Sequence, residues 1–218
     1  MCLNFKNLLI VFCCVGSFYK SAAQTNSTKK PNGNLTNKVA NKSHDWVLLS
    51  FSAGYPYTYG DTFLQTYAKK ESYHFTSLLL INTTYYLGYD FTIFKATPED
   101  TVRTGIFDKT TVCHYYVNGG RLFKISNFPL SFRTHLGIGW ANYRNKIIGN
   151  NEIIFKDEGF SISATGTLQY KLTSLFNIHL SSQWTQDFIK TETNPEIQSF
   201  FDRANYIFVH AGITISLR

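Results

Sequence analysis

Histidine is the residue type in this sequence with the widest chemical scope, because imidazole can bind a metal or exchange a proton near neutral pH. Five of the six histidines occur at positions that would face inward in the strands predicted below: His74, His114, His135, His179 and His210. No close pair has the spacing of metal ligands, and their predicted heights differ. We interpret them as part of an interior hydrogen-bond network and predict no metal site; a convergent metal centre is the alternative.

Four charged residues are predicted to share that interior: Asp90, Arg121, Arg133 and Lys171. A charge in a narrow interior must be paired or hydrogen-bonded, because removing it from water alone is costly. We expect Asp90 to pair with Arg133 or His135. The predicted structural network, which fills the lumen, consists of Asp90, Arg121, Arg133, His135, Lys171, His179 and His210. A gated ion path through the same residues is the alternative.

Serine and histidine are plentiful, as at His210 and Ser216, but nothing identifies a set of Ser, His and carboxylate. We therefore predict no catalytic residue, no cofactor-binding residue and no cofactor. The alternative is a lipid-modifying hydrolase or acyltransferase, embedded in the β-barrel that the strand pattern described below predicts. That enzyme would need a Ser, a His and a carboxylate together on the outer face, near a membrane interface.

The composition indicates which kind of structure holds these residues. Charged residues make up 16% of the chain and aromatic residues 17%, whereas an ordinary soluble domain has roughly 25% charged residues. A secretion signal is predicted over residues 1–23, with Lys6 before an apolar run and Ser21-Ala22-Ala23 at the cleavage positions. Residues 24–45 are rich in Asn, Thr, Ser and Lys and are predicted to be a disordered periplasmic linker.

Removal of the signal would leave one cysteine, Cys113, so no internal disulfide is expected. Most of the basic excess falls within the linker, at Lys29, Lys30, Lys38 and Lys42. A basic surface with interleaved aromatic residues, as nucleic-acid binding requires, is not indicated.

From residue 46 onward, apolar and polar residues alternate with a period of two, which indicates strands. Eight strands are predicted, at about residues 46–57, 73–81, 85–95, 110–125, 129–143, 158–172, 176–189 and 204–218. The pair Gly119-Gly120 is predicted to form a bulge in the fourth of them. The clearest alternation has Phe160, Ile162, Ala164, Leu168, Tyr170 and Leu172 on one face and Ser161, Ser163, Thr165, Thr167, Gln169 and Lys171 on the other.

The connections between these strands alternate in length, as they do in outer-membrane barrels. Short turns are predicted near residues 82–84, 126–128 and 173–175, and long polar loops at 58–72, 96–109, 144–157 and 190–203. The polar face carries small residues that suit a narrow lumen, and the other face carries residues that suit lipid. Aromatic residues also gather near the strand ends, where membrane interfaces are expected; those near the long loops are Tyr57, Trp140, Tyr143, Trp184 and Phe188.

This pattern over residues 46–218 resembles the small outer-membrane β-barrel family of the OmpA-barrel and OmpX type. The resemblance implies an all-β fold: an eight-stranded antiparallel up-and-down transmembrane β-barrel with short periplasmic turns and long external loops. It implies contact with outer-membrane lipid and lipopolysaccharide, with the barrel assembly machinery, and with an unknown external partner of the four loops. The predicted role is structural or loop-mediated in a Gram-negative outer membrane; a soluble secreted ligand-binding barrel, with an apolar interior, is a further alternative.

Overall fold

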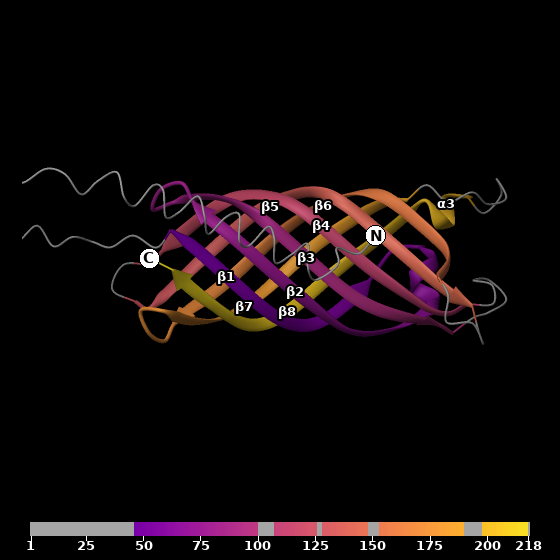
Figure 1. Ribbon diagram of the computed structural model, residues 1–218, viewed down its shortest axis with the longest axis horizontal. Coiled ribbons are helices and arrows are strands. Elements are labelled where there is room, and N and C mark those ends of the chain that lie inside the picture. The colour runs from indigo at the N-terminus through magenta and orange to yellow at the C-terminus, as the bar shows by residue number, and fades with distance from the viewer. Residues whose placement is uncertain (1–45, 100–106, 126–127, 148–152, 190–197, 218) are drawn as a thin grey trace, which may run out of the picture. The chain divides into compact units, whose positions relative to one another are not determined.

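Eight antiparallel strands form the part of the chain that the structure describes (Figure 1). The computed structural model describes residues 46–99, 107–125, 128–147, 153–189 and 198–217. The elements are β1 (Val47–Thr58), η1 (Phe63–Thr66), β2 (Tyr67–Leu80), β3 (Tyr85–Pro98), β4 (Phe107–Lys124), β5 (Leu130–Ile147), β6 (Ile153–Lys171), β7 (Phe176–Ile189), α3 (Gln198–Phe201) and β8 (Arg203–Leu217). The predicted signal and linker lie outside the described residues.

Each strand pairs with its sequence neighbour, and β1 also pairs with β8, which closes the sheet into a barrel. The closing register runs from Val47 opposite Leu217 to Thr58 opposite Tyr206. Closure leaves the sheet without an edge, so the strand backbone groups find partners within the barrel. The predicted fold class, an eight-stranded antiparallel up-and-down barrel, is confirmed.

Side chains explain why two of the turns are tight. In the turn between β2 and β3, Asn82 Oδ1 accepts hydrogen bonds from the backbone N–H groups of Thr84 and Tyr85, both at 2.8 Å. In the turn between β6 and β7, Thr173 Oγ1 accepts from the N–H of Phe176 at 2.9 Å. Short Asn and Thr side chains replace backbone acceptors in this way at turns. We call this the turn end of the barrel and the opposite end, which holds η1 and α3, the loop end.

The strands extend farther toward the loop end than the alternation predicts. β2 begins at Tyr67, β5 ends at Ile147, and β6 begins at Ile153. Parts of the predicted loops 58–72, 96–109 and 144–157 are therefore strand. Charged residues such as Arg144 and Lys156 fill these extensions, which pair with each other. A strand that continues past the apolar band needs no apolar residue on its outer face, so the period-two signal fades while the backbone ladder continues.

The predicted bulge at Gly119-Gly120 is wrong. Both glycines pair in continuous register, Gly119 with Leu87 and Leu136, and Gly120 with Tyr86 and His135. The register shifts lie instead near the loop end, between Lys69 and Ser72 and at two places in the pairs of β5.

No helix within the described ranges has the length and apolar character needed to cross a bilayer.

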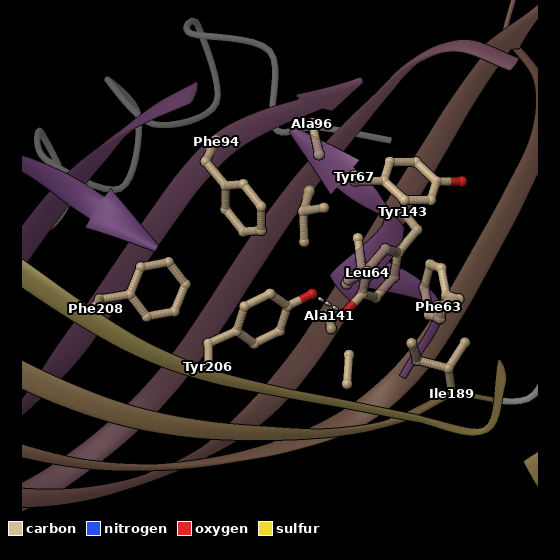
Figure 2. Close-up of a cluster of buried hydrophobic side chains, with 12 residues drawn as sticks. Phe63, Leu64, Tyr67, Phe94, Ala96, Ala141, Tyr143, Ile189, Tyr206 and Phe208 are labelled. Atoms are coloured by element: carbon tan, nitrogen blue, oxygen red, sulfur yellow. Dashed lines mark hydrogen bonds between the residues drawn. The ribbon is translucent and has the colours of Figure 1, made fainter. Parts of the chain in front are cut away.

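The outward face is apolar along most of the barrel. Large hydrophobic side chains stay exposed there, for example Leu136 at 72% and Trp140 at 63%. The inward face is polar in its middle and apolar at both ends. A cluster of Leu48, Leu78, Leu80, Tyr86 and Leu122 fills the turn end, and a larger aromatic cluster fills the loop end (Figure 2).

Candidate functional site in the barrel lumen

The polar middle of the lumen is the candidate site, and two buried carboxylates organise it. Asp90 points inward from the middle of β3, and Asp187 points inward near the loop end of β7. Their exposed fractions are 2% and 0%. A buried carboxylate must be compensated by donors or cations, so the partners of these two residues define the site.

Asp90 is compensated by histidines from two other strands. His135 Nε2 lies 2.8 Å from Asp90 Oδ2, and His74 Nε2 lies 3.6 Å from Asp90 Oδ1. The other ring nitrogen of His135, Nδ1, lies 3.2 Å from the Tyr86 hydroxyl, which donates to the Thr134 carbonyl. The structure therefore joins Asp90 to His135, the second of the two partners considered from the sequence.

Arg133 lies inward in the same region but makes no salt bridge with an acidic side chain of the described residues. Its Nη2 donates to Ser50 Oγ at 3.4 Å, and that hydroxyl lies 2.8 Å from the hydroxyl of Thr214. Thr214 Oγ1 in turn lies 3.0 Å from His179 Nδ1. Arg133 and His179 thus belong to one chain of hydrogen bonds that links β5, β1, β8 and β7.

His210 belongs to a third set of contacts. Its Nε2 lies 2.9 Å from Ser72 Oγ, and its ring packs against the rings of His74 and Phe208, with centroids 5.0 Å and 5.5 Å away. The imidazole is fully buried. His210 therefore lies beside the Asp90 group without direct contact to its carboxylate.

Asp187 collects three donors at the loop end of the polar region. His114 Nε2 lies 2.8 Å from Asp187 Oδ2, the Tyr143 hydroxyl donates to the same oxygen, and the Ser161 hydroxyl donates to Oδ1. Ser161 Oγ also lies 2.7 Å from the Tyr116 hydroxyl. The serine contacts the carboxylate and not the imidazole, so the three side chains do not have the order in which histidine activates a serine nucleophile.

An aromatic cluster fills the loop end of the lumen (Figure 2) and contacts the Asp187 group through the Tyr143 hydroxyl. The Tyr143 hydroxyl lies 2.7 Å from that of Tyr206, and η1 contributes Phe63 and Leu64, which are 9% and 0% exposed. Phe208, which the alternation placed among small polar residues, also belongs to this cluster. The prediction of mostly small polar side chains in the lumen therefore describes its middle, whereas aromatic rings fill the loop end and a smaller apolar cluster fills the turn end.

Arg121 does not face the lumen, which corrects its predicted place in the network. A bulge at Gly119-Gly120 would have switched odd-numbered residues after it to the inward face, and the prediction for Arg121 depended on that switch. Because the register is continuous, Arg121 stays on the outer face. Its guanidinium lies over the rings of Tyr85 and Phe123, 5.6 Å and 4.8 Å from their centroids.

Lys171 is also outside the network. It is the last residue of β6 and is exposed at the turn end. Its position continues the inward alternation of β6, but the strand ends there. The side chain is therefore exposed at the end of the barrel and does not enter the lumen.

Among the described residues, no group of three or more His, Cys, Asp or Glu side chains could hold a metal ion.

Several solved structures share this architecture, Neisserial surface protein A and outer membrane protein AlkL among them. Neisserial surface protein A is 9% identical, with a TM-score of 0.52, and the match covers 78% of this chain and 97% of that chain. Outer membrane protein AlkL, determined in lipid bilayers, is 11% identical, with a TM-score of 0.52, and the match covers 86% and 97%. The chain has the fold of the small eight-stranded outer-membrane β-barrels. No family model and no curated protein matches the sequence.

Within this outer-membrane barrel fold, the sequence reasoning missed Asp187 and the tyrosines around it. Asp187 follows Asn177, His179, Ser181 and Gln183 in the inward alternation of β7, so strand phase alone could have identified it. Tyr143 was assigned to an interfacial belt, yet it is 1% exposed and faces the lumen. A tyrosine suits either place, because its ring is apolar and its hydroxyl polar, so only the register distinguishes them.

Proposed function

We propose that residues 46–218 are a non-enzymatic barrel of a Gram-negative outer membrane, exported by a signal at residues 1–23. In this proposal the lumen is a structural plug, and the loop end contacts an external partner. Outer-membrane lipid and lipopolysaccharide surround the barrel, and the barrel assembly machinery inserts it.

The apolar outward face carries this proposal. Exposed Leu, Ile, Val, Phe, Tyr and Trp side chains occur on every strand of the barrel. Soluble monomers rarely expose continuous apolar patches of more than a few hundred Å², whereas lipid contact favours such a surface. A soluble ligand-binding barrel would have the opposite arrangement, with an apolar interior and a charged exterior.

The filled lumen supports a structural role over transport. Apolar clusters occupy both ends of the lumen, and the two carboxylates between them already have histidine partners. Eight strands enclose an interior just wide enough for side chains. The same burial supports a non-enzymatic role, because the Ser161, His114 and Asp187 side chains have no exposed surface.

The first expected result concerns location. The mature chain, without residues 1–23, should fractionate with outer membranes and stay in solution only with detergent, because its outward face is apolar. Cell fractionation with N-terminal sequencing of the purified chain measures both. Recovery of a detergent-free soluble chain from the periplasm would contradict the proposal and favour the soluble barrel.

The second expected result concerns orientation. A protease site inserted after Glu99, at the loop end, should be cut on intact cells, and the same site inserted after Thr83, at the turn end, should be cut only after the outer membrane is opened. Both positions are exposed, so access and not burial decides the result. Cutting at Thr83 alone on intact cells would show the barrel inverted and would remove the loop end as an external contact surface.

A further inference from the structure

A groove runs along the outward face of the barrel near its turn end, across β3 to β6. Its volume is about 550 Å³, and its lining includes Tyr85, Gly119, Arg121, Leu136, Ala164 and Gly166. Volumes of this size are typical of small-molecule sites. These six residues occupy the outward phase of their strands, whereas Gly120, His135 and Thr165, which also line the groove, occupy the inward phase. The groove therefore opens on the outward face and shares His135 with the lumen network.

Missing side chains create the groove, and apolar side chains form its walls. A Cβ atom at Gly166 would lie 3.5 Å from Phe132 Cζ, and one at Gly119 would lie 3.1 Å from Leu87 Cδ2. The floor is therefore backbone, between rings and aliphatic groups. A flexible hydrocarbon chain fits this shape and polarity, whereas a rigid polar ligand would lose its hydration there.

Arg121 gives the groove a charged end. Its guanidinium lies over the rings of Tyr85 and Phe123, and no acidic side chain of the described residues forms a salt bridge with it. Tyr85 begins β3, and Arg121 lies three residues before the end of β4. In a bilayer this depth is the interface, where an arginine is tolerated and an anionic headgroup is within reach.

We propose that the groove binds one anionic phospholipid of the periplasmic leaflet, with an acyl chain along Gly119, Ala164 and Gly166 and the phosphate on Arg121. This proposal rests on the proposed placement in an outer membrane. Guanidinium groups bind phosphate through paired hydrogen bonds, and the arginine without a carboxylate partner favours a lipid with net negative charge over a zwitterionic one.

Retention of lipid by the full mature chain tests the proposal. The chain is reconstituted into vesicles of equal parts phosphatidylcholine and phosphatidylglycerol, extracted into detergent, and weighed by native mass spectrometry. Arg121→Gln should lower bound phosphatidylglycerol about fivefold, the effect of one interfacial cation, and lower bound phosphatidylcholine by less, because the choline group already neutralises its phosphate. Gly166→Leu should lower both lipids roughly tenfold, because it fills the groove. Lys171→Gln, which removes another exposed cation at the turn end, should change neither.

Three results would overturn the proposal. The first is equal retention of phosphatidylglycerol by the wild type and Arg121→Gln, and the second is an equal loss of that lipid in Lys171→Gln. The third is displacement of the lipid by free glycerol 3-phosphate, which would indicate a phosphate site without a lipid site. Heat-modifiable gel mobility checks that each variant is folded. Failure of the wild-type chain to float with the vesicles would instead contradict the proposed membrane location, so the two proposals fail by different observations.

Discussion

Replacing Asp187 by leucine should lower the free energy of unfolding by about 3–5 kcal/mol, because three buried groups lose one shared acceptor and each unsatisfied buried group costs about 1–3 kcal/mol. The substitution leaves His114, Tyr143 and Ser161 with donors aimed at a missing acceptor. Asp187 has no exposed surface, so water cannot replace the carboxylate without opening the barrel. Urea unfolding in detergent micelles, followed by heat-modifiable gel mobility, measures the loss.

The neighbouring residue provides a matched control for this experiment. Gln186 occupies the outward phase of β7, so Gln186→Leu should change stability by less than about 0.5 kcal/mol, as surface substitutions do. The double variant His114→Phe with Asp187→Leu should lose less than the two single variants together, because both members of the pair are removed. A fully stable Asp187→Leu variant would show that this carboxylate does not organise the loop end of the lumen.

The second large effect is expected at Gly139, on the inward face of β5. A Cβ atom there would lie 1.7 Å from the carbonyl oxygen of Tyr115 and 2.9 Å from Tyr116 Cα. Gly139 pairs directly with Tyr116, so alanine must force β4 and β5 apart at a ladder position. Gly139→Ala should therefore lower the free energy of unfolding by about 3 kcal/mol, the upper end of ordinary overpacking.

Gly166→Ala makes the same chemical change where there is room. The added Cβ would lie 3.5 Å from Phe132 Cζ, an ordinary contact, and alanine restricts the unfolded chain. Stability should rise by about 0.4–1 kcal/mol. The same urea titration measures both variants. Similar gains in the two variants would show that both substitutions act through backbone entropy alone and that the close approach of β4 and β5 at Gly139 has no energetic weight.

Much of the fold could be predicted because the barrel wall separates two environments along each strand. In β8, Ile207, Val209 and Ile213 face outward, while His210 and Thr214 are buried, as the period-two pattern indicates. The loop-end extensions of β5 and β6 could not be predicted, since Arg144 and Lys156 lie where both faces tolerate polar residues. The alternation of apolar and polar residues reports which side of the barrel wall each residue faces. It cannot do so where both sides of the wall tolerate polar residues.

The lumen was less predictable than the wall, because its contacts depend on register across several strands. The inward phase predicted that Asp90 and His135 share an interior, but their 2.8 Å contact joins β3 and β5 across β4. A single phase error, at Gly119-Gly120, was enough to place Arg121 on the wrong face. The aromatic cluster depends further on η1, whose Phe63 and Leu64 lie in a segment with no period-two signal.

The pairing of β1 with β8 has a kinetic consequence. These strands are the first and last of the barrel, so their contacts have a sequence separation nearly as long as the folded domain. Such non-local contacts form slowly, because loop closure must precede any gain from pairing. Until β8 arrives, the sheet has two open edges that can pair with another chain. The interval between synthesis of β1 and docking of β8 is therefore when this chain is most exposed to aggregation, and when a holding chaperone would have the greatest effect on yield.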